Sequence, residues 1–575
     1  MHNPLARQQQ WDHSMNFSLS KYSGAAMMAT PILMFAAHAA TASVLSGVTN
    51  KPNNSTFFPG DTITVTFHAS GLTASKATTV NIKVKEEFGY ELASASILVT
   101  ADATGSAYAV YHAPSTRYGY YRVEAALPDG TAVASMGSRP GGFISYAVVA
   151  DPATRTNYGD AGSRFGMLGG FSSAMGPVMS YLGVRYLLAG PGWDALEPHQ
   201  AGEFATAHSV AVADGKKYPT SIANNHAAWP TYALPLITTG EIPAWAMNAG
   251  TGTALRPDMG PLNAEGVIGF PEFTKARASG VAADFPAQST HYYQMTWEPA
   301  IPVLFGGTPA ELVQYFQVAY SAIHQADAKA MVMGPTVFPV DPVPMQQLWS
   351  AGLAKYLDAV SVHPYVKYPP EQHGLITGIR TQMALATAAK GHSIPFLGTE
   401  HGYSSGIPGP YAAGNELKQA LANVRSTIIL LGEGFKVDVA FYIADFWAHD
   451  SSATDNTFGY YWNLNPNIKF GTDKVGPKPA VPAFAAMSYW LDGTTTVGPL
   501  TNLSGTQVGY RFTRSGETIL ALWDYTANTT MNVPVSAATA KVCDWMGNCQ
   551  TSSAVNGALK LSLGNAPVYV VGVGL

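Results

Sequence analysis

The chain has 575 residues and a formal net charge of −5, from 32 basic and 37 acidic side chains. Charged residues make up 12% of the sequence, about half of the roughly 25% that is usual for soluble domains, whereas 47% are hydrophobic. This composition excludes a disordered chain, a charge-rich coiled coil and a basic surface for nucleic acid. Because there are only two cysteines, a disulfide scaffold and a cysteine-rich metal site are also excluded.

The first 42 residues have the pattern of a secretory signal peptide. Lys21 precedes an apolar stretch at residues 24–37, and small residues spaced as A-x-A follow it. The stretch is shorter than the about 20 residues that a membrane span requires, although an uncleaved anchor is the alternative. We therefore expect residues 1–42 to be removed and the mature chain to be secreted or periplasmic, with no membrane attachment.

Residues 43–152 predict an N-terminal immunoglobulin-like β-sandwich. Polar and apolar side chains alternate at residues 62–67, 80–84 and 121–125, and Asp129 followed by Gly130 is a hairpin signal. Short strands about ten residues apart, in a segment of about 100 residues, are typical of that sandwich.

Residues 153–490 predict a (β/α)8 barrel. Short apolar runs alternate with helical patterns, such as the one that begins at Thr308 before Pro309. The runs lie at residues 165–168, 184–188, 234–237, 292–295, 330–333, 359–362, 395–397 and 439–443. Eight runs are the number that such a barrel needs. A doubly wound sheet is the alternative, but no glycine-rich phosphate-binding turn follows the first run.

Residues 491–575 return to the two-residue period of strands and predict a smaller C-terminal β-sandwich. Cys543 and Cys549 flank a five-residue turn in this segment. In an oxidising compartment we expect the two cysteines to form a disulfide. The two sandwiches either brace the barrel or bind glycan.

Two glutamates follow predicted strands of the barrel, with Glu298 after the fourth run and Glu400 after the seventh. Active sites of such barrels lie at the carboxyl ends of the strands, where strands four and seven face each other. Glycoside hydrolysis uses two carboxyl groups, one to protonate the leaving oxygen and one to attack the anomeric carbon. The pair therefore predicts a carbohydrate substrate. No motif with metal-ligand spacing is present, so we expect neither a metal nor a cofactor.

Several short motifs occur between residues 160 and 490 in a specific order. They are LGVR at 182–185, WDALEP at 193–198, IPAWA at 242–246, DAVSVHPY at 358–365, TE at 399–400 and GPKPA at 476–480. In this order they resemble the clan A glycoside hydrolases, in particular glycoside hydrolase family 39 and its relatives. The resemblance implies a retaining (β/α)8 glycosidase that cleaves a polysaccharide or oligosaccharide by double displacement, with Glu298 as acid/base and Glu400 as nucleophile.

The resemblance also implies roles for residues around the two glutamates. Arg185 and Tyr365 would hydrogen-bond the nucleophile, and His363 would line the sugar site nearest the cleaved bond. The chain departs from the clan at Trp297, because the clan usually has an asparagine before the acid/base that contacts the sugar 2-hydroxyl. This departure leaves the class of sugar open.

Further aromatic and histidine side chains near the predicted strand ends are candidates for substrate binding. Tryptophan faces suit the C–H surfaces of sugars, but the same residues could equally pack in the core. His401 is likewise either a site residue or a structural histidine. The candidates are Trp193, Trp245, Trp297, Trp447 and His401.

Two other functions are compatible with these patterns. A degenerate barrel with Trp297 and two flanking sandwiches would suit a non-catalytic carbohydrate-binding or cell-surface protein. A transglycosylase would use the same two glutamates. The sequence determines neither the sugar, nor the linkage, nor the oligomeric state.

Overall fold

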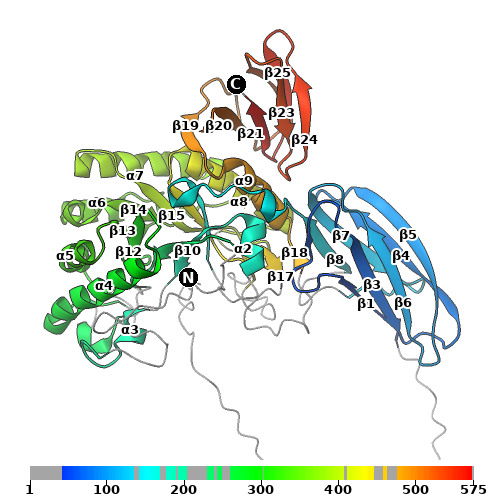
Figure 1. Ribbon diagram of the computed structural model, residues 1–575, viewed down its shortest axis with the longest axis horizontal. Coiled ribbons are helices and arrows are strands. Elements are labelled where there is room, and N and C mark those ends of the chain that lie inside the picture. Colours follow the sequence, from blue (N-terminus) through cyan, green and yellow to red (C-terminus); the bar gives the residue numbers. More distant parts are fainter. Residues whose placement is uncertain are drawn as a thin grey trace, which may run out of the picture.

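The computed structural model describes residues 42–134, 142–168, 176–189, 192–203, 229–238, 242–248, 259–301, 304–406, 409, 411–445, 457–462 and 476–572. They form a central barrel flanked by a strand-rich N-terminal unit and a strand-rich C-terminal unit (Figure 1). The predicted signal peptide lies outside the described residues, apart from its last residue. In the described part of the chain, no helix combines the length and the apolar character that crossing a membrane requires.

The N-terminal unit is a β-sandwich, as predicted. Apolar side chains alternate along its strands, so that Ile63, Val65 and Phe67 all face a buried core between the sheets. One sheet consists of β1 (Val44–Thr49), β3 (Ile63–Ser70) and β6 (Ala107–Ala113). The other consists, in spatial order, of β2 (Thr56–Phe57), β8 (Phe143–Val148), β7 (Gly119–Ala126), β4 (Ala77–Lys85) and β5 (Glu91–Thr100).

The central unit is a parallel eight-stranded barrel. Every predicted apolar run overlaps one of its strands. The strands are β9 (Phe165–Met167), β10 (Tyr186–Ala189), β11 (Tyr232–Pro235), β12 (His291–Gln294), β13 (Ala330–Val337), β14 (Ala359–Val362), β15 (Phe396–His401) and β16 (Val437–Ala440). Because β16 pairs with β9, and a bridge between Leu236 and Gln294 joins the ends of β11 and β12, the sheet closes on itself. This closure excludes the doubly wound alternative.

The described residues of the barrel unit include nine helices, the longer of which cover the outer face of the barrel. They are α1 (Gly159–Gly162), α2 (Gly176–Leu182), α3 (Trp193–Leu196), α4 (Ala264–Asp284), α5 (Pro309–Ala326), α6 (Val343–Ser350), α7 (Leu375–Lys390), α8 (Glu416–Gly432) and α9 (Ala480–Leu491). The predicted start of α5 is confirmed: Thr308 caps the helix and Glu311 completes a capping box.

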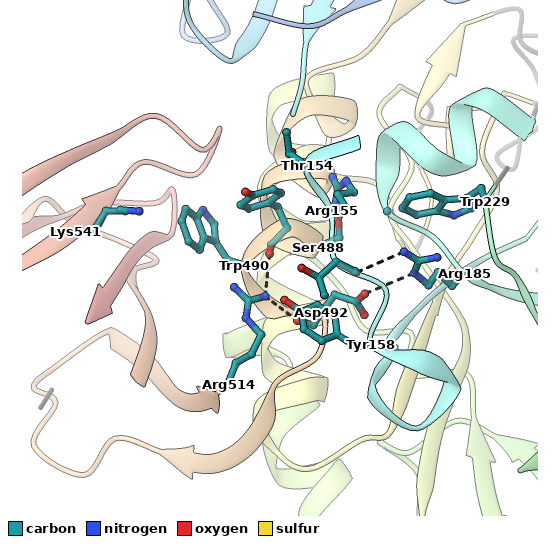
Figure 2. Close-up of a pocket in the computed structure, with 13 residues that line it drawn as sticks. Thr154, Arg155, Tyr158, Arg185, Trp229, Ser488, Trp490, Asp492, Arg514 and Lys541 are labelled. Atoms are coloured by element: carbon teal, nitrogen blue, oxygen red, sulfur yellow. Dashed lines mark hydrogen bonds and ion pairs between the residues drawn. The ribbon is translucent and has the colours of Figure 1, made fainter. Parts of the chain in front are cut away.

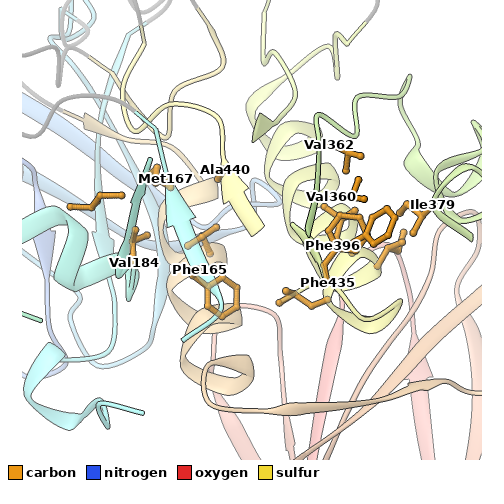
Figure 3. Close-up of a cluster of buried hydrophobic side chains, with 14 of the residues drawn as sticks. Phe165, Met167, Val184, Val360, Val362, Ile379, Phe396, Phe435 and Ala440 are labelled. Atoms are coloured by element: carbon orange, nitrogen blue, oxygen red, sulfur yellow. The ribbon is translucent and has the colours of Figure 1, made fainter. Parts of the chain in front are cut away.

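The layer between strands and helices is apolar. Val360 and Phe396 point outward from β14 and β15 toward Ile379 of α7 and Phe435 (Figure 3). None of these four side chains is more than 3% exposed. Burial of each such side chain stabilises the fold by about 1.5–3 kcal/mol, so this layer holds the strand ends in place.

The C-terminal unit is a second β-sandwich, as predicted, and its disulfide between Cys543 and Cys549 confirms the expected pairing. The larger sheet consists of β19 (Thr495–Pro499), β20 (Gln507–Arg514), β21 (Glu517–Asp524), β26 (Val568–Gly572), β23 (Thr539–Cys543) and β24 (Cys549–Ser553). The smaller sheet pairs β22 (Thr529–Pro534) with β25 (Ala558–Leu563). A short ribbon of β17 (Tyr461–Trp462) and β18 (Gly476–Pro477) completes the strands of the described residues.

The C-terminal sandwich packs tightly against the end of α8. Gly432 leaves room for the ring of Tyr510, since a Cβ at this glycine would lie 2.1 Å from the ring carbon Cδ1. The Tyr510 hydroxyl donates to Oε1 of Glu433 at 2.9 Å. A side chain at position 432 would therefore force the two units apart.

We predict that Gly432→Ala lowers the free energy of unfolding by about 1–3 kcal/mol, because the added methyl group overpacks the contact with Tyr510. Urea unfolding midpoints measure the loss. In a Tyr510→Ala background the same glycine substitution should cost much less, because the clash is gone. Equal losses of unfolding free energy in both backgrounds would contradict this account. Tyr510→Phe removes only the hydroxyl, so its unfolding midpoint measures the hydrogen bond to Glu433 alone.

Candidate active site

The carboxyl ends of β12 and β15 bring Glu298 and Glu400 together. In a parallel barrel these strand ends lie on one rim, which positions the two side chains over the same space. Glu298 is 6% exposed and Glu400 is 4% exposed. One carboxylate oxygen of each, with a ring nitrogen of His363, form a group of atoms that all lie within 4.8 Å of one another. The two predicted carboxylates therefore converge.

Glu298 has an unusual backbone conformation, with a φ of 43°. A non-glycine residue in the left-handed region is uncommon and typically needs support from its surroundings. The support comes from β13: Thr336 donates through Oγ1 to the carbonyl of Thr296 at 2.5 Å, and Thr296 donates through Oγ1 to the carbonyl of Pro335 at 3.0 Å. These bonds fix the segment that carries Glu298.

The end of β14 supplies a partner to each carboxylate. Nδ1 of His363 lies 2.7 Å from Oε1 of Glu298, within hydrogen-bond distance. The Tyr365 hydroxyl donates to Oε1 of Glu400 at 2.8 Å. Since His363 and Tyr365 are two residues apart, one short segment orients both glutamates. Nε2 of His363 is buried and has no hydrogen-bond partner among the described residues.

Tyr411 belongs to the same site but was not predicted. Its ring lies 4.7 Å from that of Tyr365, between centroids. Burial and, after it, the negative charges of Glu298 and Glu400 raise the pKa of Tyr411 to about 12. Tyr411 lies in the loop that follows β15, where no periodic pattern marks single residues. Only its place after the strand that carries Glu400 could have indicated a role.

Trp297 lies beside the two carboxylates, as expected from its place before Glu298. It is half-buried, and its ring packs edge-on against His363 with 4.8 Å between centroids. Phe338 and Tyr442 also belong to the apolar cluster around Trp297. Of the predicted binding residues, the structure thus brings Trp297, His363 and Tyr365 to the glutamates.

Arg185 does not contact Glu400, so the predicted hydrogen bond to the nucleophile is wrong. Arg185 precedes β10 and lies at the amino ends of the strands, on the opposite rim of the barrel. Its guanidinium donates to the carbonyl of Pro230 at 3.0 Å and stacks over the ring of Trp229. The LGVR motif located β10 correctly. It did not indicate that the arginine lies at the amino end of this strand.

Trp193 is a core residue, and the prediction that it lines the cleft is wrong because its side chain is fully buried. Its indole N–H donates to Oε2 of Glu197 at 2.5 Å, while Trp245, in the 3-10 turn Ala244–Ala246, donates to the carbonyl of Glu197 at 2.7 Å. The two rings pack edge-on at 5.3 Å. Both tryptophans therefore hold the loop after β10 against α4, and the structure does not bring them to the glutamates.

His401 is a structural histidine rather than a site residue. Consecutive strand residues point to opposite faces, so Glu400 points to the mouth of the barrel and His401 outward. Nε2 of His401 lies 3.0 Å from Oγ of Ser426 in α8, and Nδ1 lies 3.0 Å from Oδ1 of Asp438. Trp447, the remaining candidate, lies outside the described residues.

The same three side chains could also hold a divalent cation. Glu298, His363 and Glu400 each offer one ligand atom, of types that bind zinc and related ions. The contact between His363 Nδ1 and Glu298 Oε1 already pairs two of the three groups in the structure. The arrangement fits proton transfer between carboxyl groups and a bound molecule without any ion.

Comparison with known proteins identifies the fold. No protein-family model matches the sequence, and no curated protein matches it. A family 39 glycoside hydrolase from Bacteroides cellulosilyticus WH2 matches the structure with a TM-score of 0.62 at 16% identity, over 92% of this chain and 100% of that one. A family 39 β-xylosidase from Caulobacter crescentus matches at 14% identity with a TM-score of 0.44, over 72% of this chain and 96% of that one. A family 30 endoxylanase from Clostridium papyrosolvens C71 matches at 12% identity with a TM-score of 0.45, over 72% and 98%.

We predict that Thr336→Val lowers the free energy of unfolding by about 0.5–1.5 kcal/mol, because the buried carbonyl of Thr296 loses one of its two donors and keeps only Nε2 of Gln294 at 3.1 Å. Urea unfolding measures the loss. Thr381→Val is the matched control: its hydroxyl bonds within the exposed face of α7, so its cost should stay within about 0.5 kcal/mol. Equal costs for the two variants would show that the bond at β13 does not support the Glu298 segment.

The fold as a whole, barrel and both flanking sandwiches, is that of the family 39 glycoside hydrolase, and the resemblance indicated by the ordered motifs is confirmed at this level.

Proposed function

We propose that the protein is a retaining glycoside hydrolase that cleaves a polysaccharide or oligosaccharide. The observation that carries the proposal is the approach of one carboxylate oxygen of Glu298 to one of Glu400, within 4.8 Å. Retaining enzymes hold their two carboxyl groups about 5–5.5 Å apart, whereas inverting enzymes leave about 6.5–9.5 Å for a water molecule. The spacing favours retention, and the likeness in fold to a family 39 enzyme supports it.

In this mechanism Glu298 donates its proton to the leaving glycosidic oxygen while a carboxylate oxygen of Glu400 attacks the anomeric carbon. The C–O bond to the leaving group breaks as the glycosyl–Glu400 ester forms. Glu298, now a carboxylate, then removes a proton from water, whose oxygen attacks the same carbon and releases Glu400. Tyr365 orients Glu400 for attack, and His363 orients Glu298 toward the leaving group.

The site around the glutamates supports a substrate that lies against aromatic rings. Trp297, Tyr365 and Tyr411 offer apolar faces for the C–H surfaces of a sugar. Trp297 stands where the clan usually has an asparagine whose side-chain amide contacts the sugar 2-hydroxyl. A sugar bound here would therefore pack against the Trp297 ring in place of that hydrogen bond. The predicted signal peptide, together with the disulfide, favours a secreted or periplasmic enzyme.

We predict that Glu400→Gly lowers turnover of an aryl glycoside by on the order of 10⁴-fold or more, since it removes the attacking group. Azide restores turnover by taking the place of the carboxylate, and the azide product has the inverted anomeric configuration. Glu298→Ala should slow poor leaving groups by about 10²–10⁴-fold and activated ones far less. Glu272→Gln is the control: it changes an exposed glutamate of α4 away from the two carboxylates and should leave turnover unchanged.

Proton NMR of the first product formed decides the stereochemistry. Retention of the anomeric configuration is expected. An inverted first product, or unchanged turnover in Glu400→Gly, would overturn the proposal. Transfer to added alcohol or sugar acceptors in place of water would identify a transglycosylase with the same residues.

We predict that Tyr365→Phe lowers kcat/KM by about 10- to 100-fold, because a hydrogen bond to a charged group contributes about 1.5–3 kcal/mol. Tyr368→Phe is the matched control, since the Tyr368 ring packs against Tyr403 rather than at the glutamates. Steady-state kinetics of both variants on one aryl glycoside test the difference, and equal values would remove Tyr365 from the mechanism.

A further inference from the structure

A cavity lies at the opposite rim of the barrel from the two glutamates. It occupies about 230 Å³ between the amino ends of the strands, the linker after the first sandwich, the end of α9 and the C-terminal sandwich. Figure 2 shows Arg185 and Trp229 on its barrel side and Lys541 and Trp490 on its sandwich side. Nothing in the proposed glycosidase mechanism uses this cavity.

The lining of this cavity has an excess of positive charge. Four basic side chains, Arg155, Arg185, Arg514 and Lys541, face a single acidic one, Asp492. Burial is the main cause that lowers the pKa of Arg155 to about 10, and it lowers the pKa of Arg185 as well. Buried positive charge that exceeds its counter-charge is unfavourable, so an anion placed here would gain free energy.

The guanidinium groups are held mainly by neutral acceptors. Arg155 donates to the carbonyl of Ala485 at 2.8 Å, Arg185 to that of Pro230 at 3.0 Å, and Arg514 to that of Asp492 at 2.8 Å. Carbonyl groups fix the position of a guanidinium without cancelling its charge. Oδ2 of Asp492, the lone carboxylate, lies 4.0 Å from Nε of Arg185. The three arginines are thus held in fixed positions and share one carboxylate, which leaves the lining with a net positive charge.

Aromatic rings form the other walls. Tyr489 and Trp490 also line an adjoining cavity of about 230 Å³, whose further lining includes Ala486 and Met546. Trp490 is 8% exposed, and its buried indole N–H has no hydrogen-bond partner among the described residues. Lys541 Nζ lies 5.7 Å from the centre of this ring. Flat apolar faces, an unpaired N–H donor and several cations therefore lie close together.

We propose that this junction binds an acidic sugar, a single pyranose ring that carries a carboxylate. The ring packs against Tyr489 and Trp490, a ring hydroxyl accepts the indole N–H, and the carboxylate lies between Lys541 and the arginines. The hydroxyl of Thr154 in the lining suits a polyhydroxylated ligand better than a purely aromatic acid. The ligand touches barrel, linker and C-terminal sandwich at once, so binding joins these parts.

Isothermal titration of the full chain with glucuronate tests the proposal, with glucose as the neutral ring and inorganic phosphate as the anion without a ring. Glucuronate should bind at least about 10-fold more tightly than either. Lys541→Gln should weaken glucuronate binding about three- to fivefold, because this lysine is exposed. Lys560→Gln, the same change on exposed β25, should leave binding unaltered.

Trp490→Phe keeps an apolar face but removes the N–H donor, and should weaken glucuronate binding; because Trp490 is buried, the change also lowers the urea unfolding midpoint, so binding is compared in buffer without urea, where the variant is folded. Glu400→Gln separates the two sites, because it alters the proposed catalytic centre and not this junction. Glucuronate affinity that survives Glu400→Gln but falls in Lys541→Gln supports the proposal. Binding lost in Glu400→Gln, equal binding of glucose or phosphate, or indifference to both Lys541→Gln and Trp490→Phe would each overturn it.

Discussion

Glu298 and Glu400 are buried carboxyl groups only a few ångströms apart, and such a pair is unfavourable unless other groups compensate for the lost water and the mutual repulsion. The barrel supplies that compensation from its own rim. His363 and Tyr365, at the end of β14, bond one glutamate each. The hydrogen bonds of Thr296 with Thr336 and Pro335 tie the segment that carries the strained backbone of Glu298 to β13. The arrangement therefore depends on four neighbouring strands, β12 to β15, ending at the same level.

The flanking units pack against the barrel through a shared helix and a few specific contacts. Helix α9 is buried along most of its length and contacts all three units. Together with Tyr118 of the first sandwich and Met546 of the second, it lines the apolar cavity at their junction. The first sandwich is further tied to the barrel region by the Ser145 hydroxyl, which donates to the carbonyl of Pro477 at 2.7 Å. The cavities at the amino rim are thus one place where the units meet, and the carboxyl rim carries the glutamates.

This division explains which predicted residues reached the site. Predictions of site residues succeeded where a residue follows a barrel strand, because the carboxyl rim brings together the residues that follow all eight strands. Trp297 and Glu298 follow β12 closely, and His363 and Tyr365 follow β14. Glu400 is the last residue but one of β15. Arg185 precedes its strand and so lies at the other rim. His401 follows Glu400 directly, and the alternation of a strand turns it outward to α8.

The sequence by itself determined the three-unit organisation, the eight barrel strands, the disulfide pairing and the strand ends that carry two glutamates, because these follow from local period, spacing and order. Tertiary structure alone decided which aromatic rings face the glutamates. Trp193 and Tyr411 have equally suggestive positions in the sequence, yet the first is sealed against α4 and the second lies at the carboxylates. The charged cavity at the amino rim was equally hidden, since Arg155, Arg185, Asp492 and Lys541 meet only once the barrel closes and the second sandwich packs beneath it.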